Sequence, residues 1–153
     1  MEIVLVEPEI PPNTGNIART CALTCSRLHL VKPLGFSLED KYLKRAGLDY
    51  WHEVEVKVWD SFDDVVEGLG ENRTWWLATT KAKKSCYEAE FAPGDVLVFG
   101  RETKGLPDAI LARYPENQIR IPMKDIGRSL NLANSAAIIL YEALRQQGFP
   151  GLR

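Results

Sequence analysis

The chain has 153 residues, of which 45% are hydrophobic and 26% charged, a composition that excludes a mainly disordered protein. Its net charge is −2, from 19 Lys and Arg against 21 Asp and Glu, which excludes a uniformly basic coat for indiscriminate nucleic-acid binding. Three cysteines cannot close a disulfide framework, no apolar run is long enough to cross a membrane, and no basic leader opens the chain. We expect one soluble, cytoplasmic domain over residues 1–153 with no membrane association.

Short apolar segments alternate with segments of helical periodicity along the whole chain. In chain order the pattern predicts a strand at 3–6, a helix at 14–26, a strand at 28–32, a helix at 40–46, a strand at 54–58, a helix at 61–69, strands at 75–79 and 96–99, a helix at 107–113, a strand at 119–121 and a helix at 129–147. Asn13 or Thr14 can cap the first helix, Ser61 the third, and Pro107 suits a first helical turn. The last helix is expected to bury an apolar stripe of Leu130, Ala133, Ala137, Ile138, Tyr141 and Leu144.

Strands that alternate with helices favour an α/β fold, with a mostly parallel sheet and helices on both faces. In such sheets ligands bind beyond the carboxyl ends of the strands. Four loops that follow predicted strands are therefore the places to search for a site: residues 7–16, 79–81, 100–107 and 122–129.

Two glycines, Gly100 and Gly105, bound the third of these loops. Glycine allows a tight turn and a close approach of a ligand to the main chain, but a lone pair of this kind more often marks a turn alone. Leu106 and Pro107 stand where a phosphate-binding P-loop needs Lys and Ser or Thr. No Gly-x-Gly-x-x-Gly follows a strand, so a dinucleotide site of the ordinary type is unsupported.

Basic side chains gather in or near the same loops, whereas most acidic side chains lie elsewhere in the sequence. The basic set is Arg19, Lys81, Lys83, Lys84, Arg101, Lys104, Lys124 and Arg128. Each one alone is explained as a solvated surface charge. Together they predict a basic rim at one edge of the sheet, suited to an anionic partner.

Other reactive residue types predict structural roles. Cys21 and Cys25 have no further Cys or His pair to complete a zinc site, so we expect two core thiols and no metal. His29 lies within a strand, and Trp75 and Trp76 begin another, which favours packing over catalysis. At the start of the last helix, capping by Ser129 explains the serine but neither Asn131 nor Asn134; these asparagines suggest specific polar contacts.

Three segments resemble, in order, the signature motifs of the SPOUT superfamily of RNA 2′-O-ribose methyltransferases. They are residues 11–19 (PPNTGNIAR), 99–106 (FGRETKGL) and 121–134, with IPM at the start and RSLNLAN at the end. Residues 44–50 (KRAGLDY) further resemble the minimal subgroup that methylates the wobble ribose of certain tRNAs. The resemblance extends from Val4 to Pro150.

This resemblance implies properties that composition and periodicity do not. The fold would be an α/β knot, in which the C-terminal part is threaded into a deep trefoil. The methyl donor would be S-adenosylmethionine, leaving S-adenosylhomocysteine as product. The substrate would be the anticodon region of tRNA, at a cytidine or modified uridine in position 34. The enzyme would be a homodimer without a separate RNA-binding domain, each site being completed by the partner chain.

The resemblance also implies roles for individual residues. Arg19, Asn16, Arg128 and Asn134 would form the catalytic set. Ala78, Gly100, Ile121, Ser129 and Leu130 would surround the methyl donor, with Thr79, Glu102, Gly105 and Met123 as weaker candidates. Lys81, Lys83, Lys84, Arg101 and Lys104 would contact RNA, and Tyr141 would contact RNA or the second subunit. Arg101 departs from the proline or small residue of many relatives.

No His or paired carboxylate offers an evident base for the ribose hydroxyl, and a guanidinium is normally always protonated. We therefore expect Arg19 to bind a substrate phosphate and to orient the hydroxyl; it could act as a base only if that phosphate perturbed it. The alternatives are methylation at another tRNA or rRNA position, a nucleotide-dependent oxidoreductase, and a non-catalytic RNA-binding or assembly factor on the same scaffold.

Overall fold

The computed structural model describes residues 1–41, 43, 45 and 50–153. The helix predicted over 40–46 and the motif at 44–50 lie in part outside these residues. The described elements are β1 (Glu2–Val6), α1 (Pro11–Leu23), β2 (Arg27–Val31), η1 (Trp51–Glu53), β3 (Val56–Trp59), α3 (Phe62–Leu69), β4 (Trp75–Ala78), β5 (Lys84–Ser85), η2 (Cys86–Glu88), β6 (Val96–Phe99), α4 (Asp108–Arg113), β7 (Gln118–Arg120) and α5 (Leu132–Gln146). η1 and η2 are single turns of 3₁₀ helix.

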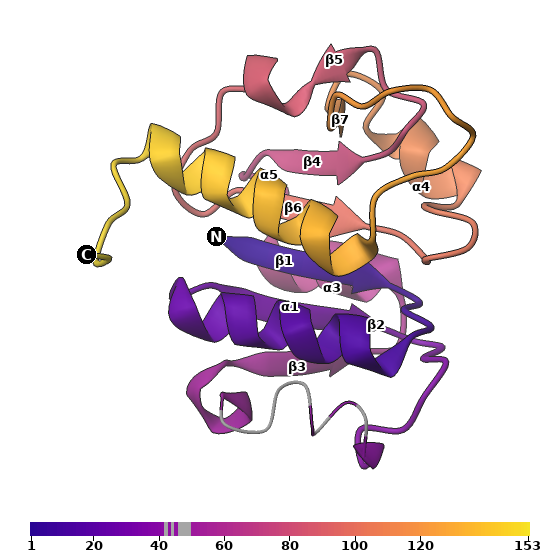
Figure 1. The fold of residues 1–153 in the computed structure, drawn as a ribbon, viewed down its shortest axis with the longest axis vertical. Helices are drawn as coiled ribbons and strands as arrows, with labels where there is room; N and C mark the ends of the chain where they lie inside the picture. The colour runs from indigo at the N-terminus through magenta and orange to yellow at the C-terminus, as the bar shows by residue number, and fades with distance from the viewer. Residues whose placement is uncertain (42, 44, 46–49) are drawn as a thin grey trace.

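The strands form one parallel sheet in the order β3-β2-β1-β6-β4-β7-β5. Because all strands run the same way, their carboxyl ends lie along one edge, where the arrowheads point in Figure 1. The loops after β1, β6, β4 and β7 are therefore neighbours, as the sequence predicted. The short β5, which pairs with β7, was not predicted.

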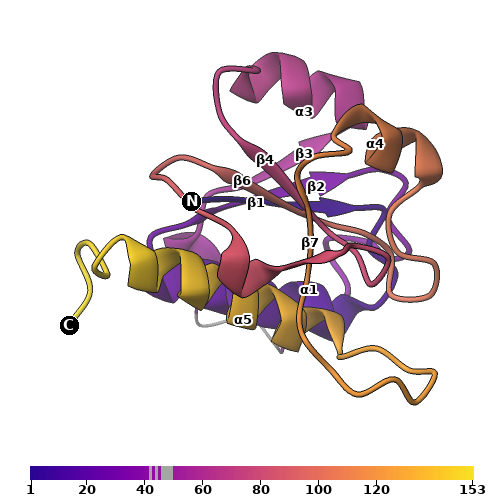
Figure 2. The same ribbon diagram turned by 90° about the horizontal axis from the view of Figure 1, so that it is seen from above.

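Helices cover both faces of the sheet, which confirms the predicted layers. Figure 2 shows α1 and α5 on one face and α3 and α4 on the other. Ile3 and Leu5 pack into the core beneath α1 and α5, whereas Val4 and Val6 pack into the core beneath α3 and α4. Positions of a strand buried on both faces favour apolar residues, and this explains the apolar run from Ile3 to Val6; Glu2, the first residue of β1, is buried but charged.

The boundaries of α1 differ from the prediction. The helix begins at Pro11 rather than Thr14, and neither Asn13 nor Thr14 is its cap. Two prolines fill its first positions, where a missing N–H costs no helical hydrogen bond. The helix ends at Leu23 rather than Ser26, and Cys25 takes a left-handed φ of 56°. Cys25 is exposed, so the prediction of two core thiols is right only for Cys21.

The start and the buried face of α5 also differ from the prediction. Asn131 caps the helix by accepting hydrogen bonds from the N–H groups of Ala133 (2.8 Å) and Asn134 (3.2 Å), so Ser129 lies outside it. The fully buried apolar residues are Ala136, Ile139, Leu140, Ala143 and Leu144. Of the predicted stripe only Leu144 is among them, and Tyr141 is 45% exposed. The buried stripe is rotated by about one residue, and Ala133 and Ile138 of the predicted stripe are partly buried against the same core.

Several local predictions are confirmed. Ser61 caps α3 through its hydroxyl, which accepts the N–H of Asp64 at 3.1 Å. Trp75, Trp76 and His29 are buried. Burial raises the pKa of the Cys21 thiol to about 12, which makes it inert at neutral pH. In the part of the chain that the structure describes, no helix is long and apolar enough to span a membrane.

Candidate active site

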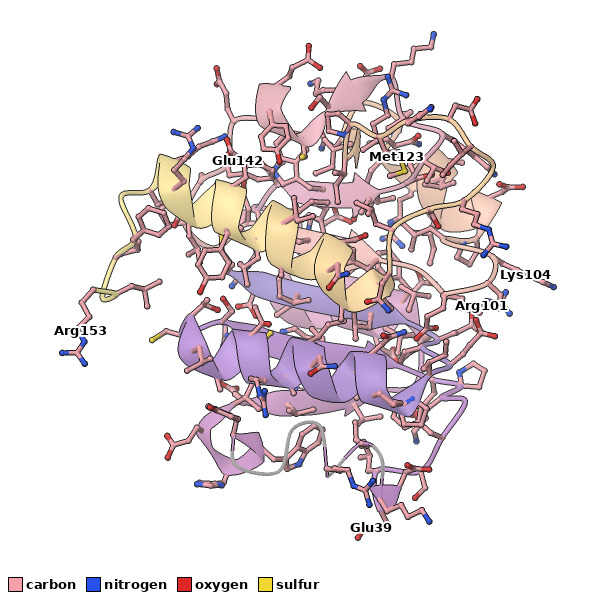
Figure 3. The ribbon with its side chains drawn as sticks, in the orientation of Figure 1. Glu39, Arg101, Lys104, Met123, Glu142 and Arg153 are labelled. Carbon is pink, nitrogen blue, oxygen red and sulfur yellow. The ribbon has the colours of Figure 1, made fainter. Side chains whose placement is uncertain are left out.

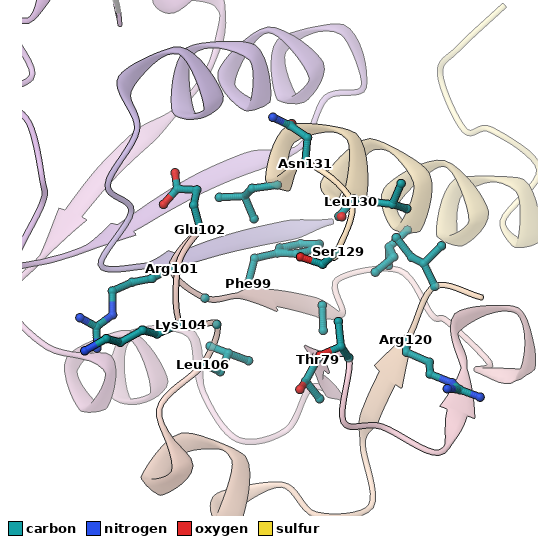
Figure 4. Close-up of a pocket in the computed structure, with 18 of the residues that line it drawn as sticks. Thr79, Phe99, Arg101, Glu102, Lys104, Leu106, Arg120, Ser129, Leu130 and Asn131 are labelled. Carbon is teal, nitrogen blue, oxygen red and sulfur yellow. The ribbon is translucent and has the colours of Figure 1, made fainter. Parts of the chain in front are cut away.

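A cavity of about 440 Å³ opens at the carboxyl edge of the sheet. Its walls come from the end of β4 with the loop after it, from the end of β6 with the loop after it, from the segment that follows β7, and from the starts of α1 and α5. Figure 4 shows Ser129 and Leu130 on one side of the cavity and Thr79 on the other, with Arg101 and Lys104 pointing outward at its rim. The loops selected from the sequence thus meet around one hollow.

The glycine loop, residues 100–105, is a tight turn closed at its neck. Arg101 N–H donates to the Gly105 carbonyl (3.2 Å), and Gly105 N–H donates to the Arg101 carbonyl (2.8 Å). A Cβ on Gly100 would lie 2.1 Å from the carbonyl carbon of Gly105, and Gly105 itself has a φ of 66°. Both glycines are therefore needed for this turn, one for space and one for its backbone angle.

Glu102 connects the glycine loop to the start of α1. Its carboxylate accepts the N–H groups of Glu9 (2.9 Å) and Ile10 (3.0 Å) and the side-chain amide of Asn13 (3.4 Å). Ile10, at the N-cap position, has no side chain that could cap the helix. Glu102 therefore holds the two residues that precede the helix from a distant part of the chain, and its negative charge is favourable near a helix N-terminus.

Two asparagines extend this connection to α5. The side-chain amide of Asn131 donates to Oδ1 of Asn13 at 3.0 Å, while Asn131 Oδ1 caps α5. A hydrogen-bonded chain therefore runs from Asn131 through Asn13 to Glu102, and all three residues line the cavity. Asn13 was predicted only as a possible helix cap, and Asn131 was predicted to make specific polar contacts without a named partner. The signal in the sequence that could have indicated a site role for Asn13 is its place directly after Pro11 and Pro12 at the start of a helix.

The structure brings together every residue that the resemblance placed around the methyl donor. Ala78, Thr79, Gly100, Glu102, Gly105, Ile121, Met123, Ser129 and Leu130 all line the cavity. Three of the predicted RNA-binding residues, Lys81, Arg101 and Lys104, line it as well. The roles assigned to these residues stay predictions, but their common location follows from the fold.

Other predicted site residues lie away from the cavity of their own chain. Asn16, Arg19, Lys83, Lys84, Arg128, Asn134 and Tyr141 are exposed and do not line it. The Arg19 guanidinium instead lies over the ring of Tyr50, 4.9 Å from its centroid. The four residues of the predicted catalytic set are therefore not assembled around the cavity by a single chain.

The chemistry of the cavity suits a small molecule with an apolar ring and polar edges. Apolar side chains such as Leu106, Ile121 and Ile139 form walls, and the glycine loop adds main-chain groups.

The carboxylate of Glu9, next to the glycine loop, is stabilised in its ionised form. Hydrogen bonds from Thr103 lower the pKa of Glu9 against the opposing effect of burial, with help from Arg101 and Lys104. Among the described residues, no group of three or more His, Cys, Asp or Glu side chains is placed to hold a metal ion.

A parallel α/β sheet with such a cavity beyond its central strands defines a protein that binds a small-molecule ligand at its carboxyl edge. More specifically, the chain belongs to the SpoU rRNA Methylase family, whose model matches residues 1–141. It is 54% identical to a tRNA (cytidine(34)-2'-O)-methyltransferase of Methylovorus glucosotrophus (strain SIP3-4), over 98% of this chain and 97% of that protein.

Solved structures give the same family. One, described as giving structural insights into the 2-OH methylation of C/U34 on tRNA, is 46% identical with a TM-score of 0.92, covering 96% of this chain and 95% of that one. The SpoU methyltransferase AviRb from Streptomyces viridochromogenes, in complex with the cofactor AdoMet, is 24% identical with a TM-score of 0.85, covering 96% of this chain and 60% of that one. The predicted α/β knot is confirmed as the fold class of this chain.

Proposed function

We propose that this chain, as a single domain over residues 1–153, transfers a methyl group from S-adenosylmethionine to the ribose 2′-hydroxyl of nucleotide 34 in tRNA. The nucleotide would be a cytidine or a modified uridine. The observation that carries the proposal is the full-length identity of 54% to a relative named for this reaction. The cavity, whose walls contain all nine residues expected around a methyl donor, supports it independently. The proposed place of action is the cytoplasm.

The residues of the cavity fit this methyl donor. Main-chain groups of the glycine loop and of the segment after Ile121 would bind the adenine edge, and Ile121 and Leu130 would hold its ring. The donor supplies an electrophilic methyl group on a sulfonium, and its product is S-adenosylhomocysteine. The protein supplies position, because a methyl displacement needs its nucleophile in line with the bond that breaks.

Arg19 would bind the phosphate beside the target ribose and orient its hydroxyl. Its guanidinium is exposed, so an RNA phosphate can reach it, and stacking on Tyr50 limits its orientations. Asn16, Arg128 and Asn134 would complete the contacts with the ribose. We expect Arg19→Ala to abolish methyl transfer and to leave S-adenosylhomocysteine affinity within about twofold in calorimetry. Loss of that affinity with normal turnover would contradict the assignment.

We further propose a homodimer in which each cavity is completed by the second copy. Arg19 lies outside the cavity of its own chain, and α1 lies beside α5 on one face of the sheet (Figure 1). On that face α5 carries the exposed ring of Tyr141, which a second copy would cover.

Mixed dimers test this arrangement. Copies that carry Arg19→Ala are combined with copies that carry Gly100→Ala, each inactive by itself. Activity that returns on mixing supports shared sites, because one cavity then has both an intact glycine loop and an intact Arg19. Mixed dimers that stay inactive, or a monomer in sedimentation velocity, would contradict the arrangement.

The anionic substrate would bind along Lys81, Lys83, Lys84, Arg101 and Lys104, with Tyr141 as a contact to RNA or to the second copy. Arg101 and Lys104 project from the carboxyl edge near Met123, whereas Glu142 lies toward the other end of α5 (Figure 3). Replacing Lys81, Lys83 and Lys84 together by Gln should weaken tRNA binding and flatten its dependence on salt, since fewer counterions are released. An unchanged salt dependence would remove these lysines from the interface.

The deciding experiment uses labelled S-adenosylmethionine and total tRNA from a strain that lacks this gene. We expect label on the 2′-oxygen of nucleotide 34, located by nuclease mapping. Label at another ribose would assign a different RNA target to the same chemistry. Tight binding of S-adenosylmethionine and tRNA without any label would instead favour a non-catalytic RNA-binding protein.

A further inference from the structure

Glu9 and Glu102 form a reciprocal clamp between two loops that are more than ninety residues apart in the chain. Glu102 of the glycine loop accepts the N–H groups of Glu9 and Ile10. Glu9 in turn accepts the N–H of Thr103 (3.2 Å) and its hydroxyl (2.8 Å) through Oε1. The predicted roles above use Glu102 but leave Glu9 and Thr103 without a function.

We propose that Glu9 is a positioning residue that, through Thr103, fixes the tip of the glycine loop to the segment preceding α1, and so couples the methyl-donor cavity to the helix that carries Arg19. This inference rests on the proposed function for the identity of the ligand. Its geometry rests on the described contacts alone.

The segment on which Glu9 lies is anchored to the sheet. Glu7 N–H donates to the Val31 carbonyl (2.9 Å), and the Pro8 carbonyl accepts the N–H of Gly35 (2.9 Å). A Cβ on Gly35 would lie 2.8 Å from Cα of Glu9, so the two backbones are in close contact. Glu9 therefore holds Thr103 against a segment that is itself hydrogen-bonded to β2 and to Gly35.

The clamp fixes the part of the glycine loop that the neck leaves free. The Arg101–Gly105 hydrogen bonds close the neck, while Glu102 and Thr103 lie at the tip. Arg101 and Lys104 help to keep the Glu9 carboxylate ionised, and an ionised acceptor makes the stronger hydrogen bonds. A loop held at its neck and tip is preorganised, so less conformational entropy is lost when a ligand binds to it.

The clamp also gives a route for coupling. Asn13 lines the cavity and Arg19 lies six residues further along the same helix. A ligand that further stabilises the clamped glycine loop would also stabilise the start of α1 through Glu9 and Glu102, and would so raise the affinity for RNA bound there. By linkage, RNA bound at α1 would then raise the affinity for the donor by the same factor.

The test compares S-adenosylhomocysteine affinity by calorimetry among the intact protein, Glu9→Ala, Glu9→Gln, Thr103→Val and Glu9→Ala with Thr103→Val. We expect Glu9→Ala to weaken binding about tenfold, since it removes two hydrogen bonds to a charged group. Glu9→Gln keeps an oxygen acceptor and should stay within about threefold. The affinity of the double variant should be no lower than that of Glu9→Ala alone, because the hydrogen bond that Thr103→Val removes is already lost in Glu9→Ala. Equal affinities across the series, or effects that add, would overturn the proposal.

Two further measurements separate this role from a merely structural one and from the proposed function. Without any ligand, amide exchange of Thr103 should be about tenfold faster in Glu9→Ala, while amides of β6 keep their protection. With tRNA present, the intact protein should bind S-adenosylhomocysteine more tightly than it does alone, and Glu9→Ala should lose that gain. If the intact protein transfers no methyl group, the proposed function fails, while Thr103 exchange still decides the clamp. Unchanged Thr103 exchange in Glu9→Ala rejects the clamp even in an active enzyme.

Discussion

The two edges of the sheet use their carboxylates in different ways. At the amino edge the buried Glu2 carboxylate is paired with charged and polar side chains: it accepts from Arg27, from His29 Nε2 (2.7 Å) and from Arg73 (3.2 Å). At the carboxyl edge, Glu9 and Glu102 mainly accept main-chain N–H groups of loops. The first arrangement neutralises a buried charge and connects the starts of neighbouring strands. The second positions loops around a cavity and leaves Arg101 and Lys104 at its rim.

The amino-edge network also fixes the state of a histidine. Trp59 Nε1–H donates to His29 Nδ1 at 3.0 Å, so His29 Nε2 carries the hydrogen that faces Glu2. Glu2 and Arg27 are the first residues of β1 and β2, and Arg73 precedes β4; His29 is the middle residue of β2 and Trp59 the last of β3. None of these residues lines the cavity. We therefore expect changes at the two edges to separate: one set should affect ligand binding and the other should affect stability.

The largest effect is expected from Gly100→Ala. Its Cβ would meet the backbone of Gly105 and Leu106 at 2.1 and 2.2 Å, so the neck of the glycine loop must open. To relieve this contact the backbone must move by about 1 Å, and a misplacement of that size in a positioning loop costs about a hundredfold in activity. We expect the affinity for S-adenosylhomocysteine to fall by a similar factor.

Gly105→Ala is the matched control in the same loop. Its φ of 66° is unfavourable for Ala, but a Cβ there meets no atom within 4 Å. The cost of the backbone angle is about 1 kcal/mol, so we expect only about a fivefold loss of affinity. If the two variants lose affinity equally, space at the neck is not what makes Gly100 necessary.

The next prediction concerns the Glu2 network at the amino edge of the sheet. Glu2→Ala removes the buried acceptor of Arg27, Arg73 and His29. The two arginines are 44% and 28% exposed and can turn to solvent, so we expect a loss of about 1–3 kcal/mol of unfolding free energy. Urea denaturation measures this loss, and Glu2→Gln, which keeps an acceptor, should lose less. S-adenosylhomocysteine affinity of the folded Glu2→Ala protein should match that of the intact protein. A loss of affinity as large as that of Gly100→Ala would show that the two edges are not independent.

The buried Glu2 carboxylate should also make the stability of the protein depend on pH. Burial alone would raise the pKa of Glu2, but hydrogen bonds from His29 and Arg27 outweigh it and hold the pKa below its ordinary value of 4.5. The unfolded chain therefore binds the proton more readily than the folded one. The contribution of Glu2 is complete above pH 4.5 and is lost as the pH falls through the lowered pKa. Urea denaturation below pH 4.5 should show a steeper decline for the intact protein than for Glu2→Gln.

The contrast between the edges explains how much the sequence predicted. Apolar runs such as β1 and alternating periodicity reveal the sheet and its layers, because burial on a face determines residue type. Helix ends were less predictable. α1 begins at Pro11 without a side-chain cap, and the residues before it are held by Glu102, far along the chain, so no local pattern around Pro11 indicates this start. The stripe predicted for α5 was also wrong by about one residue, because partly buried residues such as Ala133 and Ile138 are of the same types as the buried ones beside them.

The site was predictable as a set of loops and less so as a set of contacts. The loops that contain Gly100 and Ser129 were selected because parallel strands bring their following loops to one edge, whereas the roles of these two residues came from the family resemblance. Asn13 was read only as a cap, because its hydrogen bonds to Asn131 and Glu102 depend on three distant segments meeting. Such long-range polar contacts leave no periodic signal in the sequence.

The smallest predicted effect concerns Tyr50, which lies under Arg19 outside both edge networks. A cation–π contact at an exposed site is worth about 0.5–1 kcal/mol, so Tyr50→Leu should lower kcat by about three- to fivefold. S-adenosylhomocysteine affinity and urea stability should stay unchanged, because neither the cavity nor the Glu2 network includes Tyr50. Tyr50→Phe keeps the aromatic face and should retain nearly full activity. Equal losses in Tyr50→Leu and Tyr50→Phe would show that the hydroxyl, and not the stacking on Arg19, is what matters at this position.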